Sequence, residues 1–228
     1  MFTQRIFRRH LLLAMTVTLA LTGCASKLTS QEQFSGFLKD YSGLHEASTA
    51  SGKPVLKWVD PAFKFSDYSY MIYKPVVYYP EPKPNTQLGQ QALDEILTYT
   101  NTRVENAVRQ ATARQHIALT TQPGPRTLLM RSAITAVNTS NEGMQFYEVL
   151  PIAMVLAAGE VATGHRTQDS NIYFEGELID TQTGKVVLKV VRKGQGKQLS
   201  NANKPVTADM LKGVVDNLAS DVAAFQLN

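Results

Sequence analysis

The stretch that decides the fold is Asn171-Ile-Tyr-Phe-Glu-Gly-Glu-Leu-Ile179, followed by Asp180-Thr-Gln-Thr-Gly184 and then Lys185-Val-Val-Leu-Lys-Val-Val191. Its first and last parts are rich in β-branched and aromatic residues, which favour strands. The short polar loop between them ends in a glycine, which can adopt the positive φ of a bulged turn. Aspartate at the start of such a loop accepts hydrogen bonds from loop amides. The pattern predicts an antiparallel β-hairpin.

Further strands are predicted before this hairpin. Residues 69–79 contain many tyrosines and β-branched residues, and Pro75 removes a hydrogen-bond donor, so we expect a strand that lies at an edge or is interrupted. A short strand is predicted over residues 116–119. Residues 127–137 predict a longer strand with Arg131 and Thr135 on one face and four apolar residues on the other: Leu128, Met130, Ile134 and Ala136.

Two long helices complete the predicted fold. Apolar residues recur at helical spacing between residues 86 and 113: Leu93, Ile96, Leu97, Val104, Val108 and Ala111. Thr207 is a suitable N-cap for a second helix, whose apolar stripe is Leu211, Val214, Val215, Leu218, Val222 and Phe225. The sequence therefore predicts a single α+β domain, with a mostly antiparallel sheet covered by two long helices.

The N-terminus has the pattern of an export signal. Arg5, Arg8 and Arg9 precede an uncharged apolar run over residues 11–21, which is too short for a membrane-spanning helix of roughly 20 residues. The sequence Leu21-Thr22-Gly23-Cys24 resembles the lipobox of bacterial lipoproteins, in which the cysteine takes the lipid. Cys24 is the single cysteine of the chain, so it has no partner for a disulfide. An ordinary cleaved signal with an incidental cysteine is the alternative.

The expected organisation follows from this signal. Residues 1–23 are a cleaved signal peptide, residues 24–56 a lipidated N-terminus with a polar tether and a short packing segment, and residues 57–228 the globular α+β domain. In lipoproteins of this kind, aspartate after the cysteine favours the inner membrane, and here the residue is Ala25. The resemblance therefore implies the periplasmic face of a Gram-negative outer membrane.

Charge argues against a nucleic-acid partner. The formal charge is +4, but removal of the three arginines that precede Cys24 leaves 20 of the 23 basic residues against 19 acidic ones. Nucleic-acid binding needs a concentrated basic face. The remaining basic cluster is interpreted as a solvated end of the hairpin: Arg192, Lys193 and Lys197.

The sequence contains no recognisable catalytic, metal or cofactor motif. His45, His116 and His165 do not have the spacing of metal ligands. The run from Gly194 to Lys197 lacks the third glycine and the following helix of a phosphate-binding loop. No G-x-S-x-G motif is present, and an acylated Cys24 is not available as a nucleophile. We expect neither a cofactor nor enzymatic activity.

Glu175 and Glu177 are the best remaining candidates for catalysis, because their spacing places both carboxylates on one strand face. A glycosidase needs two carboxyl groups on opposite sides of a sugar, about 5–9.5 Å apart. Adjacent carboxylates on one face more often belong to a solvated surface. We favour that interpretation, with Phe174 and Leu178 facing the core.

Two features favour binding instead. Tyrosines of the 69–79 strand suit an interface, or cover the core of the domain itself, which we favour: Tyr70, Tyr73, Tyr78 and Tyr79. Residues 149–158 are apolar throughout and predict a short buried helix, or a contact with a partner or the membrane.

Several segments together resemble the bacterial lipoprotein family catalogued as domain of unknown function 3313. They are residues 35–41, Val59-Asp60-Pro61, residues 73–78, Gln122-Pro-Gly-Pro125 and residues 180–185. Their order and spacing cover almost all of the chain beyond Cys24. The resemblance implies envelope location and a single domain, and it implies no activity, substrate or catalytic residue.

The sequence favours a non-catalytic envelope protein that contacts other proteins, itself or the cell wall. The alternatives are a cell-wall-acting enzyme that uses Glu175 and Glu177, and a lipid-binding or lipoprotein-trafficking module that uses residues 149–158. A structure can discriminate among the three. An enzyme needs polar groups that converge in a cleft, a lipid-binding protein needs an apolar cavity, and a scaffold needs neither.

Lipidation at Cys24 is directly testable. We expect labelled palmitate to enter the wild-type protein and not Cys24→Ser, because the thiol is the acceptor of the lipid. The labelled protein should fractionate with the outer membrane. Label that persists in Cys24→Ser would refute lipidation at this residue, whereas fractionation with the inner membrane would refute only the sorting.

Overall fold

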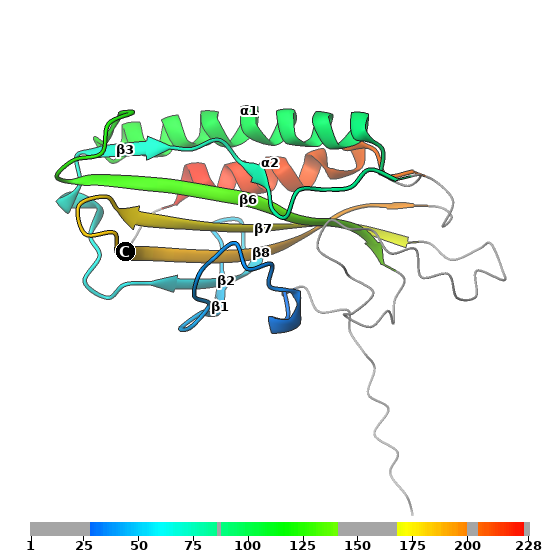
Figure 1. The fold of residues 1–228 in the computed structure, drawn as a ribbon, viewed down its shortest axis with the longest axis horizontal. Coiled ribbons are helices and arrows are strands. Elements are labelled where there is room, and N and C mark those ends of the chain that lie inside the picture. Colours follow the sequence, from blue (N-terminus) through cyan, green and yellow to red (C-terminus); the bar gives the residue numbers. More distant parts are fainter. Residues whose placement is uncertain (1–27, 86–87, 141–167, 200–204, 226–228) are drawn as a thin grey trace, which may run out of the picture.

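The structure is a computed structural model that describes residues 28–85, 88–140, 168–199 and 205–225. Cys24, His165 and the apolar run 149–158 lie outside the described residues, and so does most of the signal-peptide and anchor region. Two helices, α1 (Gln90–Arg114) and α2 (Ala208–Ala224), pack side by side on one face of an eight-stranded sheet (Figure 1). The predicted α+β class, with a mostly antiparallel sheet under two long helices, is confirmed.

The long central strands of the sheet are antiparallel and run in the order β8–β7–β6. At one end β8 pairs with β2, which pairs with β1, and at the other end β6 pairs in parallel with β3 and β4. The strands are β1 (His45–Ser48), β2 (Pro54–Val59), β3 (Tyr70–Tyr73), β4 (Val77–Tyr78), β5 (Ala118–Leu119), β6 (Thr127–Ser140), β7 (Gln168–Asp180) and β8 (Val186–Leu199). The sheet therefore begins at His45, before position 57.

The β7–β8 hairpin has the predicted turn. Gly184 has a φ of +71°, and its N–H donates to the Asp180 carbonyl at 2.8 Å. The Asp180 carboxylate accepts from the backbone N–H groups of Gln182 and Thr183 at 2.8 and 2.9 Å. It also accepts from the Tyr68 hydroxyl at 2.9 Å. Burial acts to raise the pKa of Asp180, but these hydrogen bonds outweigh it and the pKa is lowered.

The predicted strand over 127–137 contains an irregularity that the alternation of residues does not reveal. Its pairing with β7 shifts between Ile134 and Ala136. Beyond this β-bulge the faces exchange, as a one-residue insertion requires. Ala136 packs with Tyr173 on the open face, whereas Val137 joins the core under the helices. The assignment of Ala136 to the same face as Leu128 was therefore wrong.

The segment around Pro75 is interrupted, one of the two predicted possibilities. Residues 74–76 separate β3 from β4, and the Asn101 side chain of α1 bonds both the N–H and the carbonyl of Val76, at 2.7 and 3.0 Å. Helix α1 starts at Gln90 rather than near residue 86, because Gly89 is extended at the N-cap. The buried stripe residues are Leu93, Ile96, Val104 and Val108 in α1 and Leu211, Val214 and Val215 in α2, and Leu97, Leu218, Val222 and Phe225 are partly buried against the same core.

Substitutions at Gly184 test the turn. A Cβ at Gly184 would have no atom within 4 Å, so a substitution there changes stability only through the strain of the positive φ. We expect Gly184→Val to lower the free energy of unfolding by about 1–2 kcal/mol, and Gly184→Asn by less, since asparagine tolerates positive φ. Thermal melts measure the difference. Equal losses for both variants would contradict the explanation from backbone conformation.

Candidate functional site

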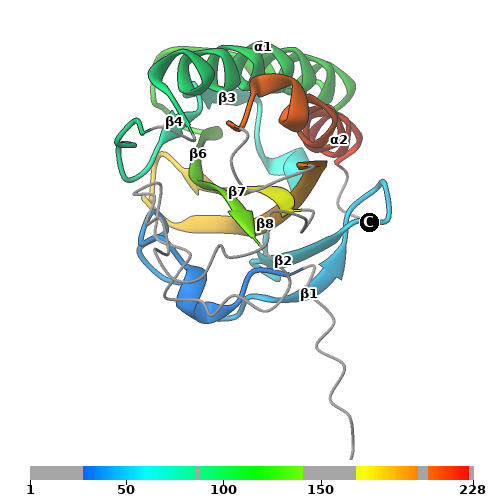
Figure 2. The ribbon, with the colours of Figure 1, turned by 90° about the vertical axis from the view of Figure 1, so that its right-hand side faces the viewer.

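The face of the sheet opposite the helices holds the candidate carboxylates. Glu175 and Glu177 point to this face, and their side chains are buried, with relative exposures of 1% and 5%. The prediction of a solvated face was wrong. The N-terminal segment, residues 34–44, lies across this face, where the blue chain runs beneath the sheet in Figure 2. The segment bonds Glu175 directly, and its Phe37 carbonyl accepts from Arg131, the partner of Glu177.

Glu175 fixes the path of the N-terminal segment. Its carboxylate accepts from the backbone N–H of Ser35 at 2.9 Å, from the N–H of Leu38 at 3.4 Å and from the Tyr41 hydroxyl at 2.6 Å. Burial and the hydrogen bond to Glu175 raise the pKa of Tyr41 to about 12, so the phenol remains a donor. A buried carboxylate needs such donors, and here they all come from one short segment.

Glu177 belongs to a second set of contacts beside the first. Arg131 Nε lies 2.7 Å from the Glu177 carboxylate, and the same guanidinium donates to the Phe37 carbonyl at 2.9 Å. Burial raises the pKa of Glu177, although Arg131 and two lysines oppose the shift. Lys189 donates to Asp40 at 2.8 Å and to the Ser42 carbonyl at 2.7 Å. Both glutamates are thus engaged in holding the N-terminal segment.

The tyrosines divide into two pairs. Tyr73 and Tyr78 face α1, where their hydroxyls donate to Asn101 at 3.4 Å and to the Leu93 carbonyl at 2.8 Å. Tyr70 and Tyr79 are exposed, together with Val77. The first pair covers the core of the domain, as we favoured. The second pair remains available for contacts with another molecule.

The histidines in the described ranges are separate. His45 lies in β1 and His116 follows α1, and both are exposed. Among the described residues, no three His, Cys, Asp or Glu side chains gather as metal ligands would. Neither of the described helices has the length and apolar character needed to cross a bilayer.

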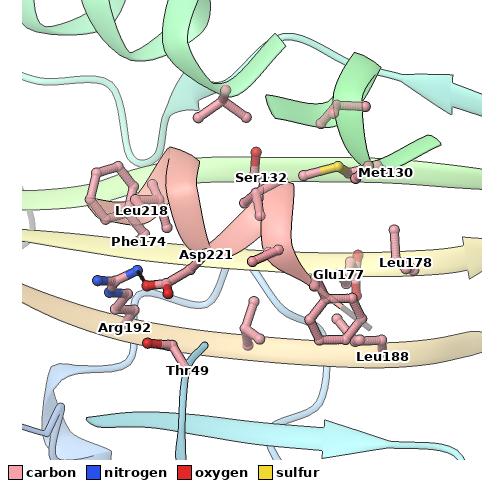
Figure 3. A pocket seen from close by; sticks show the side chains of 18 of the residues that line it. Thr49, Met130, Ser132, Phe174, Glu177, Leu178, Leu188, Arg192, Leu218 and Asp221 are labelled. Atoms are coloured by element: carbon pink, nitrogen blue, oxygen red, sulfur yellow. Dashed lines mark hydrogen bonds and ion pairs between the residues drawn. The ribbon is translucent and has the colours of Figure 1, made fainter. Parts of the chain in front are cut away.

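An apolar cavity of about 490 Å³ lies between the helices and the sheet (Figure 3). Its walls include Val104 and Val108 of α1 and Leu218 and Val222 of α2. Its floor is formed by side chains of the central strands: Met130, Phe174, Leu178, Leu188 and Val190. The volume is within the range of about 300–1,000 Å³ that is typical of small-molecule sites.

The cavity arises where two small residues meet in the middle of the sheet. Ser132 of β6 pairs directly with Gly176 of β7, and Gly176 pairs with Val190 of β8. The inward positions of both central strands therefore carry little or no side chain at one level of the sheet. A Cβ at Gly176 would make ordinary contacts, 3.4 Å from Ser132 Cβ, so the backbone does not require glycine there.

A buried ion pair lies among the cavity residues. Arg192 donates to the Asp221 carboxylate at 2.6 Å, and Asp221 also accepts from the N–H and hydroxyl of Ser51, at 2.8 and 3.0 Å. Figure 3 shows Arg192 and Asp221 side by side, close to Thr49. Arg192 is 5% exposed, so its assignment to a solvated hairpin end was wrong. Burial lowers its pKa, and Asp221 opposes this shift.

Two polar atoms of this region are buried without a hydrogen-bond partner among the described residues: Ser132 Oγ and Arg192 Nε. Unpartnered buried polar groups are rare in folded proteins. This cavity was not predicted from the sequence. The feature that could have indicated it is a pair of small residues, Ser132 and Gly176, at inward positions of neighbouring strands. To recognise that they meet, one must know the register between the strands, which the sequence does not supply.

Comparisons with known proteins agree with the sequence. The sequence model of the family DUF3313, described as a protein of unknown function, matches residues 33–222. The chain belongs to this family. It is 52% identical over 215 residues to the uncharacterized lipoprotein YdcL of Escherichia coli K12, a match that covers 94% of this chain and 95% of the relative. The same identity and coverage hold for YdcL of Escherichia coli O157:H7.

The family membership confirms the resemblance, and the protein is a lipoprotein that is lipid-anchored in the cell envelope. Solved structures are more distant. The PelC dodecamer from Paraburkholderia phytofirmans is 11% identical, with a TM-score of 0.37, and covers 75% of this chain and 98% of that chain. A DUF4136 family protein from Bacteroides thetaiotaomicron is 12% identical, with a TM-score of 0.30, and covers 74% and 96%.

Glu175→Gln tests the function of this carboxylate in holding the N-terminal segment. The glutamine side chain carries no charge, and its NH2 group would face the three groups that now donate to the carboxylate. We expect the free energy of unfolding to fall by about 1.5–3 kcal/mol, as for hydrogen bonds to charged groups. Amide hydrogen exchange at Leu38 should become faster. Glu46→Gln, at an exposed position of β1, is the matched control. Unchanged exchange at Leu38 would show that the segment is held by other contacts.

Proposed function

We propose that this lipoprotein is a non-catalytic binding protein, anchored through Cys24 at the periplasmic face of the outer membrane, and that its domain accommodates an apolar molecule such as a lipid chain. The apolar cavity under the helices carries this proposal. A scaffold needs no such cavity, so the structure moves lipid binding ahead of the scaffold function that the sequence favoured. The described lining residues of the cavity belong mainly to α1, α2 and the sheet, and residues 149–158 lie outside the described residues.

The candidate catalytic residues do not favour the enzyme alternative. Glu175 and Glu177 are covered by the N-terminal segment, and their oxygens are bonded to it or to Arg131. The cavity itself is lined mainly by apolar side chains, and its charged lining residues include the Arg192–Asp221 pair and Lys57. The location proposed for the protein depends on Ala25 after the cysteine, and lipid anchoring would place the cavity close to a supply of acyl chains.

Contact with another envelope protein, or self-association, is a second candidate function. Tyr70, Val77 and Tyr79 are the large exposed hydrophobic side chains among the described residues, and they belong to β3, β4 and the residue after β4. Tyrosine is enriched at interfaces because it combines apolar area with a hydroxyl. This surface lies on other residues than the cavity, so the two functions are compatible.

Ser132→Leu tests the cavity as the binding site. The new side chain fills the space above Gly176 and removes an unpartnered hydroxyl, so we expect the free energy of unfolding to rise by about 1 kcal/mol. Binding of the apolar dye Nile red should be lost at the same time. The measurement uses the mature chain, residues 24–228, with Cys24→Ser, so that no attached lipid competes.

Ser220→Leu is the control, because Ser220 is exposed on α2 beside the cavity residue Asp221. This variant adds the same side chain outside the cavity and should bind the dye as the parent does. If Ser132→Leu also binds Nile red normally while remaining folded, the dye binds elsewhere and the proposal fails.

A further inference from the structure

Lys57 of β2 continues the row of residues that forms the floor of the cavity. Ser132, Gly176 and Val190 are paired directly across β6, β7 and β8, and Val190 is paired in turn with Lys57. Residues directly opposite each other in an antiparallel sheet project to the same face. Lys57 therefore lies on the helix side of the sheet, and it lines the cavity together with the other three residues.

The Lys57 side chain lies where the cavity reaches the surface. Its Nζ is 5.9 Å from the centre of the Phe225 ring, at the end of α2. Three other lining residues, from the β1–β2 hairpin and from the end of α2, are exposed: Ser48, Ala50 and Ala224. Lys57 itself is partly buried. The opening of an apolar cavity therefore carries an ammonium group.

The Lys57 ammonium is available to a ligand. Among the described residues it has no hydrogen bond and no ion pair, and its distance from the Phe225 ring is close to the limit of about 6 Å for a cation–π contact. An ammonium carries three donors and no acceptor. Unlike Arg192 Nε, Lys57 Nζ is not a buried unpartnered atom, so a group that enters at the opening can reach it.

The other charged residues that line the cavity already have partners. Arg192 and Asp221 are paired with each other at 2.6 Å. The carboxylates of Glu175 and Glu177 point to the opposite face of the sheet, where the N-terminal segment and an arginine hold them. Lys57 is therefore the cation without a carboxylate partner among the described lining residues. An anion at the opening would be attracted, and a second cation would be repelled.

We propose that the cavity binds a single-chain amphiphile with an anionic head, with the carboxylate or phosphate at Lys57 and the acyl chain under α1 and α2. This assignment rests on the proposed function and names its ligand class. Buried apolar residues line the space for the chain, among them Met71, Val76 and Ile117. Hydrogen bonds between ions are stronger than those between uncharged groups, and an anion at the opening keeps part of its hydration.

Competition with bound Nile red tests the ligand class on the mature chain, residues 24–228, with Cys24→Ser. The probes have alkyl chains of equal length: laurate, lauroyl lysophosphatidate, monolauroylglycerol and dodecyltrimethylammonium. They are used near neutral pH and below the concentrations at which they form micelles. We expect the tighter anion to bind about 10-fold more tightly than monolauroylglycerol, and the cation to bind most weakly. The order of the two anions distinguishes a carboxylate from a phosphate head.

Lys57→Met removes the charge and keeps an unbranched apolar side chain. We expect the affinity for the tighter anion to fall by about 10-fold and that for monolauroylglycerol to change by less than about 2-fold. Lys57→Arg should retain the preference for anions. Lys53→Met is the matched control, because Lys53 is exposed in the same hairpin and does not line the cavity. Unchanged affinity for the anions in folded Lys57→Met would overturn the assignment of Lys57.

The outcomes separate the two proposals. A parent protein that does not bind Nile red contradicts the proposed function itself. A parent that binds Nile red but releases it to none of the four probes, or to monolauroylglycerol or the cation first, contradicts only the ligand class. If Lys57→Met fails to fold, the order of the four probes on the parent protein decides the question.

Discussion

The burial of the Glu175 carboxylate in the middle of the sheet is the constraint on which the open face of this structure depends. A charge at that depth requires hydrogen-bond donors, and the neighbouring strands have already used theirs in the sheet. The N-terminal segment supplies them through Ser35, Leu38 and Tyr41. Once these three bonds form, Phe37 and Leu38 become buried, and the open face of the sheet acquires a second, smaller core.

The packing of the N-terminal segment also limits the distance between the domain and the lipid anchor predicted at Cys24. Thr29 is buried, and the 3-10 turn Gln31–Gln33 follows it directly. Four peptide units connect Cys24 to Leu28, and they span at most roughly 14 Å when fully extended. A tether that continued to Gln33 would reach roughly twice that distance. A lipid on Cys24 would therefore hold the sheet close to the membrane surface.

Elements that depend on residues adjacent in the sequence could be predicted from the sequence alone. The turn at Asp180 and Gly184 and the apolar stripes of both helices follow from the chemistry of a few adjacent residues. The burial of Glu175 could not be predicted, because the residues that cover it lie more than 130 positions earlier in the chain. The bulge after Ile134 and the meeting of Ser132 with Gly176 depend on strand register, which is a property of the folded sheet.

The glycines of the sheet differ in whether packing requires them. A Cβ at Gly194 would collide with Val214, and a Cβ at Gly196 would lie 2.6 Å from the Met210 carbonyl, so close packing of α2 requires both glycines. A Cβ at Gly176 would make ordinary contacts at 3.4–3.6 Å, and glycine within a strand costs about 0.5–1 kcal/mol relative to alanine.

The Arg192–Asp221 pair is also expected to cost stability. Well-packed apolar residues at such a position are often more stable than a buried ion pair. Gly176, Ser132 and this pair line one cavity, and both an unpartnered buried hydroxyl and a buried ion pair are expected to lower the stability of the domain. A bound apolar molecule would add packing contacts inside this cavity, which is why we interpret the cavity as a binding site.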